Sequence, residues 1–247
     1  MKKLILLFSL LLITKLNGQC NINFPELNDL YYNIYDYNFN GFSAEVDFEL
    51  IAKIKESLKD EIKIDALNKL TFSVVLYSKD SIVFNSSGID TTGDEDFDRG
   101  LSQIIYGAEK TVKGVLLSWA TSCFTPAFEP EKFVYNCSDD SSLTIVNYER
   151  EGSKVIIFLN NITNIDSIYI SNKIEDIKVH PFYEKTDYNK MIIKSLVTSV
   201  NNLLEVYMEI DYRDFDKIKI PERIKVSSKT QNNFKELSFK LNNIVLK

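Results

Sequence analysis

The sequence is poor in the residue types around which most active sites are built. It contains one histidine, eight glycines and three cysteines in 247 residues. A Ser-His-Asp triad would have to use His180, which directly precedes Pro181, and no GxSxG segment supplies a nucleophile. A single histidine also excludes HExxH and multi-histidine zinc sites. No GxGxxG or other glycine-rich phosphate loop is present, so nucleotide binding of that kind is not indicated.

Acidic residues are abundant, but their pattern does not define a site. Asp94, Asp96 and Asp98 alternate as in a calcium loop. The sixth and twelfth positions of such a loop need Gly and Glu, and here they hold Arg99 and Ile105. We interpret Asp94 or a neighbour as a helix cap, with acids favourably placed in the first turn. A hydrolase built on paired carboxylates stays open, although nothing singles out a pair. We therefore expect a protein that is not an enzyme, with no catalytic residues, cofactor or metal.

The three cysteines show no CxxC spacing, which argues against a zinc ribbon or a thioredoxin-type site. Cys123 and Cys137 flank a short loop that contains proline, and we favour a disulfide between them. Two buried thiols are the alternative. Cys20 would then be the odd cysteine.

The first 18 residues, MKKLILLFSLLLITKLNG, have the pattern of a signal peptide. Two lysines precede an apolar run from Leu4 to Ile13, which is shorter than the about 20 residues of a transmembrane helix. We expect cleavage after Gly18, with an uncleaved anchor as the alternative. Lipidation of Cys20 is a further option, although Gln19 stands where bacterial lipoproteins have a small residue. The sequence thus predicts an exported protein, periplasmic or secreted.

The charge balance argues against nucleic acid as a partner. Loss of the three signal-peptide lysines lowers the formal net charge from −6 to −9. No dense run of Lys and Arg is present, and phosphate binding depends on such clusters. Outside the signal no segment is apolar enough to span a bilayer, so we expect no transmembrane span and a soluble mature protein. The sequence leaves the oligomeric state open.

Helical periodicity is strongest over residues 94–120. Apolar residues recur there at spacings of three and four and form one broad stripe, which predicts a long helix lying against a large surface. Gly107 and Gly114 each weaken such a helix by about 1 kcal/mol relative to Ala, which packing of the stripe has to offset. Residues 24–37 also predict a helix, with proline in its first turn. Residues 51–69 fit a helix or, in their first part, a continuing strand.

Alternating apolar residues predict strands through most of the remaining chain. Residues 42–50 form one such stretch, and residues 70–84 predict two strands around Ser78-Lys79-Asp80. Eight short alternating runs follow, at residues 142–149, 154–160, 166–171, 175–180, 190–200, 203–212, 223–228 and 234–241. Because their connections are short and rich in turn residues, neighbouring strands should be antiparallel. We expect a meander of at least seven strands in a single domain, residues 19–247.

The last strands indicate how this sheet is built. In residues 204–210 Leu, Val, Met and Ile occupy one face, with Glu205 and Glu209 on the other, and the two final runs repeat the apolar alternation. Pro221, which lacks an N–H, suits the first residue of a strand. One face of the sheet is therefore dry and has to be covered, and the helices are the only candidates. The predicted fold class is α+β, with a curved antiparallel sheet covered on its concave face by helices.

This order of elements resembles that of a known superfamily. A signal peptide, an N-terminal helix, a strand beginning GFSAEVDF, a long amphipathic helix and a meander end in EIDYRDFDKIKIPERIKVSS and ELSFKLNNI. The pattern is similar to that of the periplasmic outer-membrane lipoprotein carriers, the LolA-like superfamily, and is most specific over residues 203–247. The resemblance implies an unclosed half-barrel wrapped around helices, with an apolar ligand such as an acyl chain between the two. No residue matches the family's lipoprotein-binding arginine on the early strands, so none is assigned.

On this basis we expect a carrier or sensor that binds a lipid or lipoprotein. The candidate ligand contacts are apolar residues of the long helix and of one closing strand: Phe97, Ile104, Ile105, Val112, Leu116, Trp119, Val206 and Met208. The tyrosines Tyr31, Tyr32, Tyr35 and Tyr37 either line the mouth of the site or pack as core. The alternative is a structural or protein-interaction module of the same fold, whose interior is filled by its own side chains.

Overall fold

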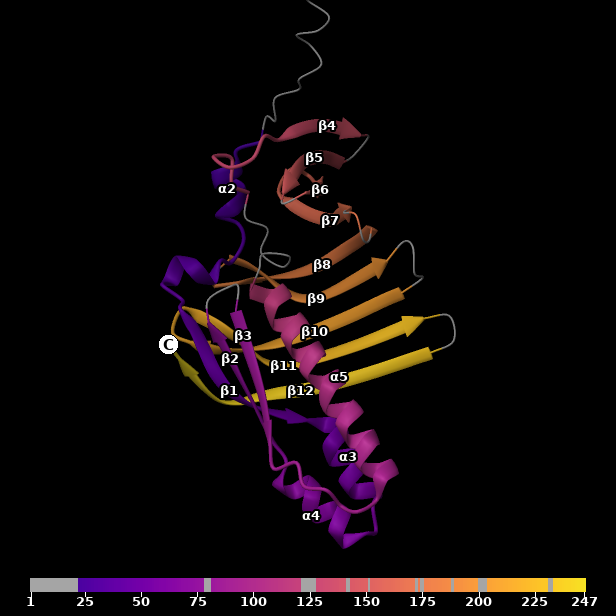
Figure 1. Ribbon diagram of the computed structural model, residues 1–247. Helices are drawn as coiled ribbons and strands as arrows, with labels where there is room; N and C mark the ends of the chain where they lie inside the picture. The colour runs from indigo at the N-terminus through magenta and orange to yellow at the C-terminus, as the bar shows by residue number, and fades with distance from the viewer. Residues whose placement is uncertain are drawn as a thin grey trace, which may run out of the picture. The chain divides into compact units, whose positions relative to one another are not determined.

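The strands form one antiparallel sheet of twelve, with a small number of helices, as a computed structural model shows (Figure 1). The structure describes residues 22–77, 81–120, 128–140, 143–150, 152–171, 173, 176–187, 189–199, 204–230 and 233–247. The strand order is β3-β2-β1-β12-β11-β10-β9-β8-β7-β6-β5-β4, so the sheet is unclosed and has β3 and β4 as its edges. The predicted α+β class with an unclosed antiparallel sheet is confirmed.

Strands β4 to β12 follow one another both along the chain and in the sheet, as expected for a meander with short turns. Their bounds are Asn136–Asp140 (β4), Leu143–Arg150 (β5), Ser153–Asn160 (β6), Asn164–Ser171 (β7), Asp176–Thr186 (β8), Asn189–Ser199 (β9), Leu204–Phe215 (β10), Ile218–Thr230 (β11) and Asn233–Leu246 (β12). The first three strands, β1 (Gly41–Phe48), β2 (Thr71–Tyr77) and β3 (Ser81–Ser87), continue the sheet beyond β12. Pairing of β1 with β12 therefore joins the first strand to the last.

The longest helix is α5 (Glu95–Ala120), which agrees with the prediction for residues 94–120. Two shorter helices, α3 (Glu49–Ser57) and α4 (Glu61–Lys69), occupy the segment that fitted either a helix or a strand. The helical interpretation is therefore the correct one. Asp60 fixes the start of α4, because its side chain accepts hydrogen bonds from the first backbone N–H groups of that helix.

The continuous helix predicted over residues 24–37 is wrong. Phe24–Asn28 form a short helix, α2, and Ile34–Tyr37 form a 3-10 helix, η1. Between them in the chain, Tyr31 forms a parallel bridge with Lys190, and the N–H of Tyr32 donates to the Lys190 carbonyl at 2.8 Å. Long-range pairing thus uses backbone groups that a continuous helix would have bonded internally.

Pro221 also lies elsewhere than predicted, since it is the fourth residue of β11 and not the first. Its ring is buried. The pairing of β11 with β12 begins at Arg223, two residues later. On the side of β12, Pro221 therefore costs no ladder hydrogen bond, because it precedes the stretch that β12 pairs.

The chain divides into two compact units, each made of segments that are distant in sequence. Unit 1 comprises residues 1–30, 127–181 and 196–205, and unit 2 comprises residues 31–126, 182–195 and 206–247. The boundary falls within β8, β9 and β10. The single domain of residues 19–247 stays a prediction.

Unit 1 has aromatic packing of its own, in which α2 contacts the segment before β4. The ring of Phe24 lies 5.3 Å from that of Phe128 and 4.3 Å from that of Tyr135, centroid to centroid. The Asn28 side chain donates to the Phe128 carbonyl at 2.6 Å and accepts from the Phe128 N–H at 2.9 Å. The segment that directly precedes β4 is therefore held against α2 by ring contacts and by two hydrogen bonds.

Several predictions concern residues outside the described part of the chain. The signal peptide, its cleavage after Gly18 and the state of Cys20 all fall within residues 1–21. Cys123 is likewise not described, whereas Cys137 lies on β4, directly opposite Val146 of β5. The Cys123–Cys137 disulfide therefore stays a prediction.

Candidate functional site between helix α5 and the sheet

Helix α5 begins at a capped N-terminus. Asp94 accepts hydrogen bonds from the N–H groups of Asp96 at 3.1 Å and Phe97 at 3.0 Å, which satisfies donors that a helix leaves unpaired. The same carboxylate lies 2.7 Å from the Lys63 Nζ of α4. Their hydrogen bond lowers the pKa of Asp94 and raises that of Lys63. The predicted capping role of this acidic segment is confirmed, and the cap also ties α5 to α4.

The apolar stripe of α5 is largely buried within unit 2. Val112 and Leu116 have no exposed surface, and Ile105 and Trp119 are also buried. Phe97 and Ile104 are half-buried and pack against the same core. Of the two predicted strand residues, Met208 belongs to this core, whereas Val206 is half-buried and lies outside it. The structure therefore brings together all the predicted ligand contacts except Val206.

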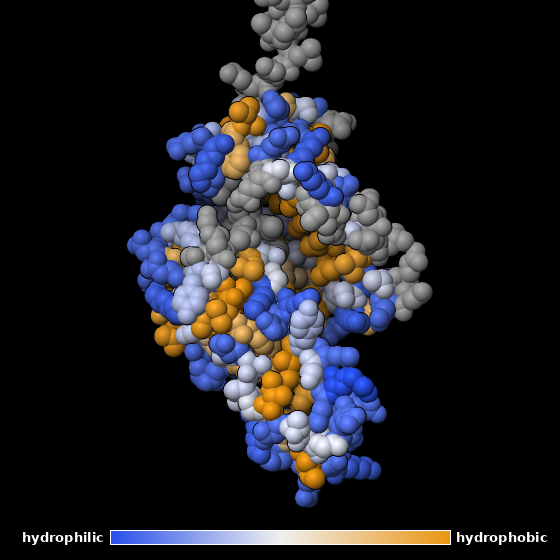
Figure 2. Space-filling model, in the orientation of Figure 1, coloured by the Kyte–Doolittle hydropathy of each residue, from blue (hydrophilic) through white to orange (hydrophobic). Residues whose placement is uncertain are grey.

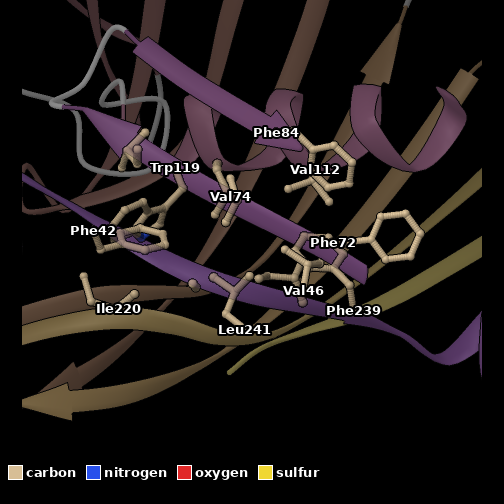
Figure 3. Packing of buried hydrophobic residues seen from close by; sticks show 14 of the residues in the cluster. Phe42, Val46, Phe72, Val74, Phe84, Val112, Trp119, Ile220, Phe239 and Leu241 are labelled. Atoms are coloured by element: carbon tan, nitrogen blue, oxygen red, sulfur yellow. The ribbon is translucent and has the colours of Figure 1, made fainter. Parts of the chain in front are cut away.

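The stripe meets side chains from the inner face of the sheet, as Figure 3 shows. Phe84 of β3 lies beside Val112 in this view. The Trp119 ring lies 6.4 Å from that of Phe42 on β1 and 6.2 Å from that of Phe39, both edge to face. Such edge-to-face contacts are favoured by the charge distribution of aromatic rings. The C-terminal part of α5 is thus seated on an aromatic cluster provided by the protein itself.

The opposite side of α5 has different chemistry. Figure 2 shows hydrophilic side chains over the outward surface of its N-terminal half. Ser102, Gln103 and Lys110 are exposed there, and Gly107 and Gly114 lie on the same outward side. The helix is therefore amphipathic in the way that its sequence predicts, with its apolar side on the sheet.

Three buried or half-buried tyrosines anchor the aromatic cluster through their hydroxyl groups. Tyr212 donates to the Ile192 carbonyl at 2.8 Å, and Tyr35 donates to the Ala120 carbonyl at 2.9 Å, at the end of α5. The Tyr32 hydroxyl donates to the Lys217 carbonyl at 3.2 Å and accepts from the Lys219 N–H at 2.8 Å. Burial raises the pKa of both Tyr32 and Tyr212, so these phenols stay neutral donors.

The tyrosines before β1 therefore pack as part of the protein interior. Tyr31 and Tyr32 are buried, and the Tyr31 ring lies 4.8 Å from that of Tyr183 on β8. Tyr37 stacks on Tyr32 with ring centroids 5.8 Å apart. Of the two roles considered for these residues, core packing is the one that these contacts favour.

The outer face of strands β9 to β12 carries pairs of oppositely charged side chains. Lys194 of β9 bonds Glu209 of β10, and Lys225 of β11 lies 3.1 Å from Glu236 of β12. The hydrogen bond from Lys194 lowers the pKa of Glu209, and the bond to Glu236 raises the pKa of Lys225. These ion pairs are accessible to solvent, so they contribute little to stability. They show that this face of the sheet is in contact with water.

Three open grooves can be described from the residues that line them. The largest, about 550 Å³, is bordered by α3 and by polar side chains of β1, β2 and β3, including Asp47, Thr71 and Asn85. A second, of about 480 Å³, lies along the paired charges of the outer face, and a third, of about 460 Å³, lies in unit 1 near Tyr148. None of the three is lined by a residue of α5.

His180, the only histidine, is half-buried on β8. Within the described ranges, no three His, Cys, Asp or Glu side chains are grouped closely enough to hold a metal ion. In the same part of the chain, no helix has both the length and the apolar character needed to cross a membrane.

The fold and the buried contact define a helix-covered antiparallel sheet, an architecture compatible with binding proteins of several kinds. The chain matches no family model, no curated protein and no solved structure. The resemblance to the LolA-like carriers therefore stays a prediction.

The groove beside α3, which is lined by both polar and apolar side chains, was not found by sequence reasoning. Alternation in residues 42–50 places Glu45 and Asp47 on the outer face of β1, but it does not say which strand lies beside them. Their neighbours Ser73 and Asn85 follow from the pairing of β1 with β2 and of β2 with β3. Strand register between distant segments leaves no local signal from which the groove could have been found.

Proposed function

We propose that this protein is an exported, non-enzymatic interaction module, in which the space between α5 and the sheet is filled by its own side chains. It would bind a protein partner through its outer face or an edge strand. The observation that carries the proposal is the complete burial of Val112 and Leu116 against strand residues of unit 2. The competing hypothesis is a carrier that holds a lipid in the same space.

The energetics favour the filled interior. Full burial of a Val or Leu side chain stabilises a protein by about 1.5–3 kcal/mol. An acyl chain bound at α5 would have to displace such contacts, and also the ring contacts of Trp119 with Phe39 and Phe42. A ligand in any of these three grooves would not touch the predicted contacts on α5.

Native mass spectrometry tests the proposal. The protein is produced in a bacterial periplasm, purified without detergent, and measured before and after incubation with fatty acids and phospholipids. In every sample we expect the mass of one chain or of two chains, with no added mass from a ligand. A discrete added mass that solvent extraction identifies as lipid would contradict the proposal and support the carrier.

The proposed export and disulfide are checked on the same material. Cleavage after Gly18 predicts a mature chain that begins at Gln19. The mass of the intact chain shows directly which residue is first. A Cys123–Cys137 disulfide predicts a peptide pair that is joined without reductant and separated with it. Joining of Cys137 to Cys20 would contradict the predicted pairing.

A further inference from the structure

The two edges of the sheet differ in the features that prevent strands from pairing with other molecules. Exposed edges are usually protected by charged side chains, proline, bulges or short length. Strand β4 is short and ends in Asp139 and Asp140. Strand β3 has the sequence SIVFNSS, with no charge and no proline. It pairs with β2 through all seven residues, from Thr71↔Ser87 to Tyr77↔Ser81, without a bulge.

Strand β3 has one strand neighbour, β2. In the part of the chain that the structure describes, no backbone hydrogen bond joins β3 to another segment outside this pairing. Helix α5 packs on the inner face of β3, where Phe84 is buried. The opposite side chains of β3, such as Val83, face outward and are exposed.

A row of three valines and one serine, which we call the apolar row, leads across the outer face to this edge. Val83 on β3 lies opposite Val75 on β2, which lies opposite Ser43 on β1, which lies opposite Val245 on β12. Directly opposed residues share one face of a sheet. Val83 is 41% exposed and Val245 is 60% exposed. The row on one side holds Glu45, Ser73 and Asn85, and the row on the other side holds Gly41, Tyr77 and Ser81, so the row with the valines is the most apolar of the three.

We propose that β3 pairs antiparallel with β3 of a second copy of this chain, with Val83 opposite Val83. This inference does not depend on the proposed function. In this register the apolar rows of the two copies become continuous across the two-fold axis. Ile82 then lies opposite Phe84 on the inner face, and Ser81 lies opposite Asn85 on the outer face. Apolar residues meet apolar ones and polar residues meet polar ones.

The charge pattern favours a second copy as the occupant. The chain carries 29 basic and 35 acidic residues, so its formal net charge of −6 weakly opposes association of two copies. Strand β3 is a seven-residue stretch without charge, and it can approach itself without that repulsion. Because antiparallel pairing is symmetric, one strand supplies both halves of the interface.

Sedimentation equilibrium over a range of concentrations tests the interface. We expect wild-type protein to dimerise and Val83→Lys to raise the dimer dissociation constant by at least about tenfold, because two lysines would lie directly opposite. Val245→Lys is the matched control, since it adds the same charge to the same row three strands from the edge, and it should leave the dimer intact. A monomeric wild type, or a dimer unaffected by Val83→Lys, would overturn the proposal.

Cysteine cross-linking tests the register without a disruptive charge. With copper–phenanthroline and oxygen as oxidant, Val83→Cys should form a disulfide between two copies, because directly opposed Cβ atoms lie about 4.5–5.5 Å apart and need only a small approach to reach disulfide distance. Asn85→Cys is the control, since Asn85 faces Ser81 of the other copy and not itself. Linkage of Val83→Cys without linkage of Asn85→Cys supports the register, and any other pattern contradicts it.

Discussion

The two faces of the sheet in unit 2 use nearly the same strands for opposite purposes. On the inner face, Phe42 and Phe239 have no exposed surface, and the Phe42 ring contacts Trp119 of α5. On the outer face, ion pairs such as Lys225–Glu236 stay in contact with solvent. Stability should therefore depend strongly on the inner face and weakly on the outer one. The outer face remains available for contacts with other molecules.

The largest effect is expected from a cavity under α5. Leu116→Ala removes a side chain with no exposed surface and should lower the free energy of unfolding by about 3 kcal/mol, since Leu→Ala in a core costs about 2–5 kcal/mol. Urea denaturation measures the difference. Tyr106→Ala, on the same helix but 58% exposed, is the control and should change little. Equal effects of the two variants would mean that α5 does not pack as described.

A smaller effect is expected from the hydroxyl of a buried phenol. Tyr212→Phe keeps the ring but removes the donor to the Ile192 carbonyl, so a buried acceptor loses its partner. The free energy of unfolding should fall by about 1–2 kcal/mol, as measured by the same denaturation. Tyr77→Phe is a control on an exposed tyrosine of β2 and should have no such effect.

A gain in stability is expected on the outward side of α5. A Cβ added at Gly114 would meet no atom within 4 Å, so Ala fits there without strain. Because Ala favours the helix over Gly, Gly114→Ala should raise the free energy of unfolding by about 0.5–1 kcal/mol. A loss of stability on thermal denaturation would contradict the placement of Gly114 on the outward side.

The smallest effect is expected from the outer charges. Glu209→Gln should change the free energy of unfolding by less than about 0.5 kcal/mol, because exposed ion pairs contribute little. Lys194 holds the pKa of Glu209 below its usual range in the folded state. The contribution of this carboxylate is therefore present above the usual Glu pKa and is lost as the pH falls through the lowered value. Comparison of wild type and Glu209→Gln at pH 7 and at acidic pH checks the sign.

Local patterns were sufficient for much of the fold. The helical spacing of apolar residues in α5 and their alternation in β1 and β10 reflect which face of each element is buried. Burial of one face can therefore be read from the sequence. The stripe of α5 also identified most of the buried contact with the sheet. Val206 lies on the same strand as Met208 but outside the buried core, because alternation assigns a side chain to a face and does not show how deeply it is buried.

Features set by long-range pairing could not be predicted. The segment NCSDD of β4 has little strand propensity and is a strand because β5 pairs with it. The predicted helix over residues 24–37 is interrupted because Tyr31 pairs with Lys190, 159 positions further along the chain. Which strand forms the edge of the sheet likewise depends on the pairing of β1 with β12. The exposed position of β3 therefore has no local signal.

The central claim, a filled space under α5, is tested most directly at Trp119. It is the only tryptophan of the chain and is buried at the contact between α5 and the sheet. Brominated fatty acids and phospholipids quench tryptophan only at close range, so titration with them reports a ligand at this position. We predict blue-shifted emission that brominated lipid leaves unchanged. Saturable quenching would contradict the filled interior and show that a lipid occupies the space between α5 and the sheet.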